Sequence, residues 1–307
     1  MEIRGIRRED VPRAMELLRE AFAGELSTWG ANLARAERVL RFLLALDRLP
    51  LRALGLLGLR FEVWVARQGD EVIGVLGQFD GRPPVLSGIA VAREARGRGV
   101  AKSLMRHAFA DLRGRGAPLV LGSVRADNAA ALELCASVGM ESYGRVRIYS
   151  VPLPPRALPV VPKGVAVRVG TRGDVARLIP PDLGKGSLRR LSRLNAAFAP
   201  WPLRLVGIRR SAIAAEVDGE LVGLVALQTG RYWGGATVQA PIVLDGDPQV
   251  FLALLSAATA EVMRRREGRA YFVLPDDLWR YSWAIARMGG EPIGEWVQLV
   301  RYLDQRG

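Results

Sequence analysis

The chain has 307 residues, of which 50% are hydrophobic, and a formal net charge of +13. This length suits about two domains with buried cores and excludes an intrinsically disordered chain. A single cysteine and a single histidine exclude an intrachain disulfide and a histidine-rich metal site. The first residues lack the apolar segment of a signal peptide, and no uncharged apolar run reaches the ~18 residues that span a membrane. We therefore expect a cytoplasmic protein with no membrane association and no metal.

The positive charge comes almost entirely from arginine. Lysine occurs only at Lys102, Lys163 and Lys185, which leaves 41 arginines among the 44 basic residues. Such a bias is typical of a solvated surface in an arginine-rich composition, and it also attracts anionic ligands. No basic run is interleaved with aromatic residues that could stack on bases, so we expect no nucleic-acid partner.

The first half of the chain predicts alternating strands and helices. An apolar strand at 3–6 is followed by helices over 11–23, which Asp10 can cap, and over 32–47. The sequence QGD at 68–70 joins two strand-like runs into a predicted hairpin. The run PVLSGIAV at 84–91 predicts a third strand.

Two further strand–helix pairs complete this half. A loop at 92–99 leads into a helix that reaches about residue 113, and the aliphatic run at 117–124 predicts a buried strand. A helix capped by Asp127 or Asn128 ends at Gly139, and a strand at 145–151 closes the first domain. This order predicts an α/β fold with a sheet of mixed direction.

The second half repeats landmarks of the first half in the same order. The pairs are QGDEVIG (68–74) with VDGELVG (217–223), GMESYG (139–144) with GGEPIG (289–294), and RGIRREDV (4–11) with RVGTRGDV (168–175). Together they indicate a duplication. A segment with five prolines lies between the copies and reads as an extended connector. We predict domains at 1–152 and 163–307 with a proline-rich linker at 153–162.

The segment VAREARGRGVAKSLM (91–105) lies between a predicted strand and a predicted helix. Gly97 and Gly99 let a ligand approach the backbone closely. Amides at the start of the next helix lack intrahelical partners and lie at the positive end of its dipole. Arg96, Arg98 and Lys102 add positive charge. The segment therefore fits a phosphate or pyrophosphate, although RGRGVA alone also fits an ordinary arginine–glycine turn.

This loop and a later segment together resemble the GNAT superfamily of acyl-CoA-dependent N-acyltransferases. Arg96, Gly99 and Ala101 match the Arg/Gln-x-x-Gly-x-Gly/Ala loop of that family. The later segment NAAALELCASVGM, which begins at Asn128, matches its Asn-x-x-Ala-x-x-Leu pattern followed by glycine. The match covers residues 2–151 and is densest over 86–141.

The resemblance implies two GNAT-type domains, each with a mixed, mostly antiparallel sheet flanked by helices. It implies that acetyl-CoA lies in the first domain, where two strands splay apart. Asn128 would hydrogen-bond to the pantetheine arm or the neighbouring strand, and it is also suited to capping its helix. The main chain of three strand residues would pair with that arm: Ile89, Ala90 and Val91. The pyrophosphate would be held by the loop and the first helical turn: Arg96, Gly97, Arg98, Gly99, Val100, Ala101 and Lys102.

Cys135 stands where many family members have a tyrosine that protonates the departing thiolate. A thiol with an ordinary pKa of about 8.5 could be this general acid, or Cys135 could be a small buried side chain. The general base is not identified by the sequence. Three carboxylates lie in the relevant part of the predicted sheet, and each also fits a surface or turn position: Glu62, Glu71 and Asp80.

The second copy lacks these cofactor features. The sequence DGDPQVFLALL (245–255) stands where the loop should be, and its aspartates would stabilise a helix N-terminus but repel a phosphate. Leu278 and Ile285 replace Asn128 and Cys135. We expect a degenerate GNAT-like domain that does not bind acyl-CoA. Most of its aromatic residues are expected in cores: Trp201, Tyr232, Trp233, Trp279, Tyr281 and Trp283.

These features favour a tandem acetyltransferase. It would move an acetyl group from acetyl-CoA directly to a primary amine of a small molecule or peptide, with segment 32–59 as one wall of the acceptor pocket. The alternative is a noncatalytic acyl-CoA-binding regulatory protein, because the tyrosine is missing and no base is identified. A nucleic-acid-associated protein would instead show steep salt dependence of DNA binding.

Overall fold

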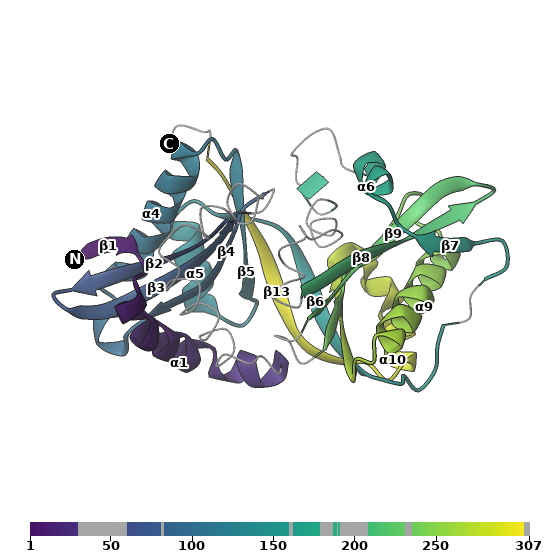
Figure 1. Ribbon diagram of the computed structural model, residues 1–307, viewed down its shortest axis with the longest axis horizontal. Helices are drawn as coiled ribbons and strands as arrows, with labels where there is room; N and C mark the ends of the chain where they lie inside the picture. Colours follow the sequence, from purple (N-terminus) through teal and green to yellow (C-terminus); the bar gives the residue numbers. More distant parts are fainter. Residues whose placement is uncertain are drawn as a thin grey trace. The chain divides into compact units, whose positions relative to one another are not determined.

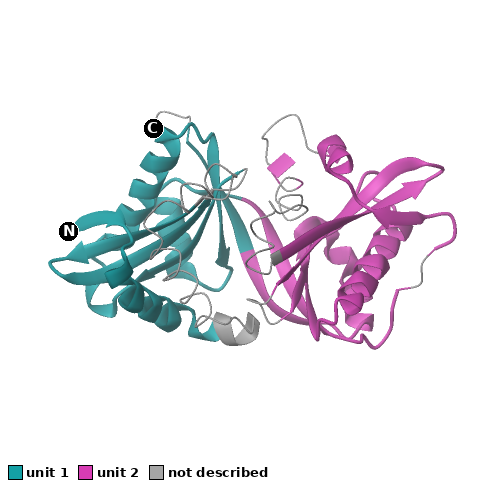
Figure 2. Cartoon of the chain, viewed as in Figure 1, with its two compact units in different colours: residues 1–142, 297–307 teal, residues 143–296 magenta. Residues whose placement is uncertain are grey.

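The computed structural model describes residues 1–29, 60–80, 83–159, 162–178, 187–188, 190, 208–230 and 235–303. Three predicted features lie outside these residues: the helix over 32–47, the pocket wall at 32–59 and the aromatic residues Trp201, Tyr232 and Trp233. The chain forms two compact units, shown in Figure 2. Unit 1 comprises residues 1–142 and 297–307, and unit 2 comprises residues 143–296.

Unit 1 is a mixed sheet flanked by helices (Figure 1). Its strands follow the order β1-β2-β3-β4-β5, followed by the last part of β13. The first four pair antiparallel, and β4 pairs in parallel with β5. Its elements are β1 (Glu2–Gly5), η1 (Arg8–Asp10), α1 (Val11–Trp29), β2 (Arg60–Gln68), β3 (Glu71–Asp80), β4 (Val85–Val91), η2 (Arg93–Ala95), α4 (Val100–Gly114), β5 (Leu119–Arg125) and α5 (Ala129–Ser137).

Unit 2 repeats this plan of a sheet flanked by helices (Figure 1). Its strand order is β7-β8-β9-β10-β12-β6, and β11 pairs with β9. Its elements are β6 (Glu141–Pro152), β7 (Ala166–Val169), α6 (Arg172–Leu178), β8 (Ile208–Val217), β9 (Glu220–Gly230), β10 (Ala236–Val238), β11 (Ile242–Val243), α9 (Pro248–Arg264), β12 (Arg269–Pro275), η3 (Asp276–Tyr281), α10 (Ser282–Arg287) and the first part of β13 (Glu291–Tyr302).

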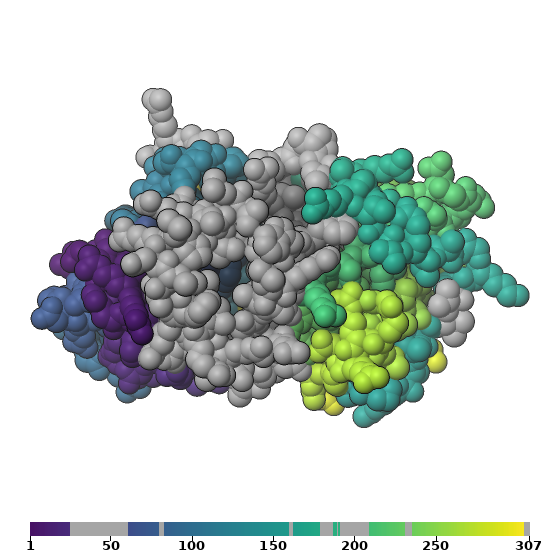
Figure 3. All heavy atoms as spheres, in the orientation of Figure 1, coloured from purple at the N-terminus to yellow at the C-terminus, as the bar shows by residue number. Residues whose placement is uncertain are grey.

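Helices bury apolar faces against the sheet in both units. In unit 1 the core includes Leu17 of α1 and Leu104 of α4, at 2% and 0% exposure. In unit 2 it includes Phe251 and Leu254 of α9. The first residues, purple in Figure 3, lie on the surface of unit 1, as expected for an edge strand. The predicted α/β fold, with mostly antiparallel sheets flanked by helices, is therefore confirmed.

The duplication is visible in the backbone at the repeated landmarks. A bulge between Ala66 and Arg67 in the β2–β3 hairpin recurs between Ala215 and Glu216 in the β8–β9 hairpin. Gly139 and Gly289 follow α5 and α10 with φ values of 76° and 85°. Each glycine amide donates to the carbonyl three residues earlier, at 2.9 Å in both cases. Glycine is favoured there because it adopts this left-handed conformation without strain.

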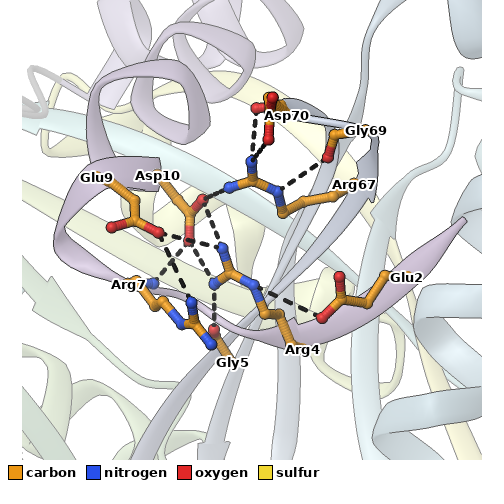
Figure 4. A network of polar contacts seen from close by, with 9 residues as sticks. All are labelled: Glu2, Arg4, Gly5, Arg7, Glu9, Asp10, Arg67, Gly69 and Asp70. Carbon is orange, nitrogen blue, oxygen red and sulfur yellow. Dashed lines mark hydrogen bonds and ion pairs between the residues drawn. The ribbon is translucent and has the colours of Figure 1, made fainter.

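The third landmark is a buried carboxylate held by arginine. Asp10 accepts from Arg4 and Arg67, each at 2.7 Å, and from the Arg7 amide at 2.8 Å (Figure 4). Burial alone would raise the pKa of Asp10, but the Arg7 amide and the Arg4 and Arg67 guanidiniums hold this pKa below its ordinary value. The network ties β1 and β2 to the start of α1.

Unit 2 repeats this network with one change of charge. Arg168 donates to Asp174 at 2.7 Å, and the Thr171 amide also donates at 2.7 Å. Glu216 stands at the hairpin position of Arg67 and accepts from Arg168 at 2.8 Å. The hydrogen bond from Arg168 holds the pKa of Asp174 well below its usual range despite desolvation. The landmark therefore marks a structural fastening between strand and helix.

We expect Asp10→Asn to destabilise unit 1 by about 3–5 kcal/mol at pH 7, because two arginines lose their buried carboxylate. A carboxylate with a lowered folded-state pKa stabilises above its unfolded pKa, and this contribution is lost as pH falls through the folded value. The difference from wild type should therefore shrink below about pH 4. Urea unfolding at pH 7 and pH 3, with hydrogen exchange of unit 1 peptides as the readout, measures this difference in the free energy of unfolding. Asp70→Asn is the control, because Asp70 is exposed and lies 3.6 Å from Arg67.

The units exchange their final strands. Residues 146–152 of β6 pair antiparallel with residues 269–275 of β12 in unit 2. The end of β13 belongs to unit 1, beside β5. Two backbone hydrogen bonds follow the same exchange. The Leu153 amide donates to the Gly268 carbonyl at 3.1 Å, and the Leu303 amide donates to the Pro118 carbonyl at 2.8 Å.

The predicted domain boundary therefore differs from the division of the structure. The strand predicted at 145–151 exists, but it pairs in unit 2 instead of closing the first domain. The compact units divide at 142/143, and not in the proline-rich segment 153–162. The proline-rich composition of 153–162 indicates an extended connector, but it does not determine which sheet the preceding strand joins.

Candidate functional site

The glycine loop joins β4 to α4 in unit 1. Gly97 and Gly99 have φ values of 74° and 75°, in the left-handed region that other residues rarely adopt. Gly99 is the N-cap of α4. A Cβ atom at either glycine would meet no atom within 4 Å. Backbone conformation, and not lack of space, therefore favours glycine at these two positions. The space beside both residues is open.

Amides at the start of α4 are available to a ligand. The first bond of the helix runs from the Ser103 amide to the Gly99 carbonyl at 2.9 Å. The amides from Gly99 to Lys102 precede it and have no intrahelical acceptor. The first turn of α4 has no acidic residue, and Arg96, Gly97, Arg98 and Gly99 are exposed. This arrangement presents donors and positive charge to an anion.

The strands before the loop splay apart. The parallel register between β4 and β5 is confined to Val85 opposite Leu121. Further along β4, Ala90 and Val91 pair with Val75 and Gly74 of β3. The side of β4 toward β5 is therefore left open over Ile89, Ala90 and Val91.

A bulge and one side-chain contact shape this end of β4. The register with β3 shifts between Val75 and Gly77, and Gly88 has a φ of 65°. Arg96 turns back and donates its Nε to the Val91 carbonyl at 3.2 Å. The structure thus brings the predicted strand residues and loop residues to one end of β4. The Val91 carbonyl already accepts one hydrogen bond there.

Asn128 is the N-cap of α5. Its Oδ1 accepts from the Ala131 amide at 3.1 Å, and its carbonyl accepts from the Leu132 amide. Its predicted capping role is therefore confirmed. The side chain is exposed, and its amide group keeps its donor capacity for a ligand.

Cys135 is buried in the core of unit 1, with 7% exposure. Burial raises the pKa of its thiol to about 11. A thiol with this pKa is a weaker acid than an ordinary thiol, so the geometry favours the packing alternative for this residue.

The three candidate bases lie off the strands that border the opening. Glu62 is on β2, opposite Gln78 of β3. Glu71 lies at the β2–β3 turn, 3.6 Å from Arg13. Asp80 ends β3. None of the three is on β4 or β5, so the splayed strands themselves supply no candidate from this set.

Unit 2 has a shorter, acid-capped loop at the equivalent position. Gly74 faces Val100 and Leu104 of α4, and Gly223 faces Val250 and Leu254 of α9. The eight residues 92–99 thus correspond to the six residues 244–249, of which the last two already belong to α9.

The helix start in unit 2 is occupied by its own side chain. Asp247 caps α9 and accepts from the Gln249 amide at 2.7 Å. The stabilising role predicted for this acidic N-terminus is confirmed. Leu278 and Ile285 are buried, at 8% and 1% exposure. The helix start of α9 therefore differs from that of α4 in charge, length and available donors.

Comparison with known proteins adds to this geometry. Residues 38–140 match the model of the acetyltransferase (GNAT) family. No curated protein sequence matches the chain. A tandem GNAT protein from the clavulanic acid biosynthesis pathway, solved without AcCoA, is similar over 100% of this chain and 99% of its own, with 18% identity and a TM-score of 0.62.

The chain has a tandem GNAT fold, and the family match itself covers residues 38–140. A GCN5-related N-acetyltransferase from Sphaerobacter thermophilus has the same fold over 98% of this chain and 95% of its own, with 18% identity and a TM-score of 0.62. The fold of the chain is thus that of a tandem GNAT protein, and the family match lies in the half that carries the glycine loop. GNAT acetyltransferases use acetyl-CoA and act on small-molecule or peptide acceptors.

Two further properties concern the part of the chain that the structure describes. Its residues include no group of three or more histidine, cysteine, aspartate or glutamate side chains that could hold a metal ion. None of its helices combines the length and apolar character needed to cross a membrane.

Sequence reasoning missed the contribution of the C-terminal strand to unit 1. Val297, Leu299 and Leu303 pack in the same core as α4 and β4. Because β13 lies beside β5, it supports one border of the splayed pair. The spacing of about 150 residues in two of the three landmark pairs was the available signal, because it places β6 and β13 at equivalent positions of the two copies.

Proposed function

We propose that unit 1 binds acetyl-CoA and transfers its acetyl group to a primary amine. The proposal rests on one observation, the open end of β4 running directly into a left-handed glycine loop and the unpartnered amides of α4. The pantetheine arm would pair with the main chain of Ile89 to Val91. The pyrophosphate would lie on the amides of the loop and of the first turn of α4, with Arg96, Arg98 and Lys102 supplying charge.

The transfer is a direct displacement. The amine nitrogen forms a bond to the acetyl carbon, the bond from that carbon to sulfur breaks, and the amine loses one proton while the thiolate gains one. A water chain serves as the proton acceptor in this proposal, because the candidate carboxylates lie on β2 and β3. Cys135 is assigned to packing, and solvent protonates the thiolate.

Unit 2 is proposed to be a GNAT-like domain without acyl-CoA binding. The Asp247 cap, the shortened loop and the buried Leu278 and Ile285 support this assignment. The alternative for the whole chain is a noncatalytic acyl-CoA-binding regulator, which the buried Cys135 favours. Thiol release from acetyl-CoA with a panel of primary amines tests transfer. Equilibrium binding without thiol release for any amine would support the regulator.

Cys135→Ala is expected to keep kcat/KM within about threefold of wild type. General acid catalysis contributes about 100-fold or more, so loss of a true acid would be plain. The rate should be measured from pH 6 to pH 9, together with acetyl-CoA affinity and melting temperature. A 100-fold lower rate with unchanged affinity and stability would show that Cys135 is the acid.

A further inference from the structure

Unit 2 contains a cavity of about 530 Å³ between β11 and η3. It arises because β10 pairs in parallel with β12, whereas β11 pairs only with β9. The chain thereby diverges from β12, and η3 follows β12 on the other side of the space. The volume is within the range of about 300–1,000 Å³ that small-molecule sites occupy.

One wall of the cavity is apolar. Ile242 and Leu244 contribute from the β11 side, and Leu278 and Tyr281 from η3. Leu244 is 41% exposed, although it is a large aliphatic residue. Tyr281 is fixed, because its ring stacks on Phe251 at 4.3 Å and its hydroxyl donates to the Gly246 carbonyl at 3.0 Å. A rigid apolar wall with an exposed leucine suits an apolar ligand body.

Two arginines, Arg190 and Arg280, give the cavity lining positive charge. The Arg280 guanidinium lies 4.9 Å from the centre of the Tyr281 ring, and its Nη2 reaches to 3.5 Å from the Cβ position of Gly246. Arg190 also lines the cavity. Within the described ranges, neither arginine has a carboxylate oxygen within 4.0 Å. Their donors are available to an acceptor in the cavity, and guanidinium binds carboxylate in bidentate geometry.

Acidic groups near the cavity limit the charge of the ligand. Asp277 lines it, and Asp245 and Asp247 flank Gly246. A polyanion such as CoA would meet these carboxylates, and the Gln249 amide is already bonded to Asp247. A single negative charge placed on the two arginines avoids most of this repulsion.

We propose that this cavity binds a small monocarboxylate with an apolar body. The carboxylate would accept from Arg280 and Arg190, and the body would lie on Ile242, Leu244, Leu278 and Tyr281. This site is separate from the acetyl-CoA site of unit 1 and stands whether or not unit 1 is catalytic.

Isothermal titration of the full chain with octanoate and 4-phenylbutyrate tests the proposal. Acetyl-CoA is present at saturation, so that the opening in unit 1 is filled. We expect one saturable site for at least one carboxylate, and octanol should bind at least about tenfold more weakly than octanoate. Hydrogen bonds to a charged group contribute about 1.5–3 kcal/mol, so Arg280→Gln should weaken binding roughly 10- to 150-fold.

Arg287→Gln is the matched control. Arg287 is exposed on α10 and does not line the cavity, and its substitution removes the same charge. Its affinity should stay within about twofold of wild type. Any of four results would overturn the site: no saturable binding of either carboxylate, equal binding of octanol, equal loss in the two variants, or displacement of the carboxylate by acetyl-CoA. A melting curve checks that Arg280→Gln is folded.

Discussion

Gly99→Glu is expected to lose acetyl-CoA binding while unit 1 stays folded. Gly99 is exposed, and a Cβ there would meet no atom within 4 Å, so the new side chain has room. The left-handed φ of 75° costs a non-glycine residue about 1–2 kcal/mol. A carboxylate at a helix start offsets part of this cost by its favourable interaction with the helix dipole.

The same carboxylate would oppose a pyrophosphate on the loop. Two like charges about 4 Å apart repel by about 4 kcal/mol at an effective dielectric constant near 20, so we expect affinity to fall at least about 100-fold. Titration calorimetry with acetyl-CoA measures the loss, and the far-ultraviolet circular dichroism spectrum checks folding.

Gly116→Glu is the matched control for this prediction. Gly116 has a φ of 74°, and a Cβ there would also meet no atom within 4 Å. It lies just beyond the other end of α4, so the backbone strain is the same and the pyrophosphate site is not touched. Normal acetyl-CoA affinity in Gly99→Glu, or an equal loss of affinity in Gly116→Glu, would contradict the proposal that this loop binds the pyrophosphate of acetyl-CoA.

Local features of the fold were predictable because neighbouring residues determine them. The helix after the loop, the Asn128 cap and the turn at Gly139 follow from capping and left-handed glycine, which act within one helical turn. The β2–β3 hairpin follows from QGD between two strand-like runs. The same rules identified the acidic start of α9.

Features that depend on distant residues were not predictable in the same way. The alternation in 145–151 indicates a strand. Its pairing partner is not determined by this pattern, because β5 and β12 are related by duplication and the strand could pair with either. The burial of Cys135 depends on packing around α5, which its own sequence does not fix. β10 ends at Val238 and β11 begins at Ile242, directly after Pro241, and the cavity of unit 2 lies at this break.

The strand exchange makes a reciprocal prediction for Leu299 and Tyr149. These residues stand at equivalent positions of β13 and β6 and are each 5% exposed, but Leu299 belongs to the core of unit 1 and Tyr149 to the core of unit 2. Truncation of a buried leucine or aromatic side chain costs about 2–5 kcal/mol. Leu299→Ala should therefore weaken unit 1, although it lies near the end of the chain.

Hydrogen exchange read separately for each unit distinguishes the two effects. Leu299→Ala should speed exchange in α4 and β4 and reduce acetyl-CoA affinity. Tyr149→Ala should speed exchange in α9 and β12 and leave that affinity within about twofold of wild type, because the opening beside β4 is not in its unit. Each variant serves as the control for the other. If each strand closed the sheet of its own half, the two results would be interchanged, and the role of the C-terminal strand in supporting the loop site would be lost.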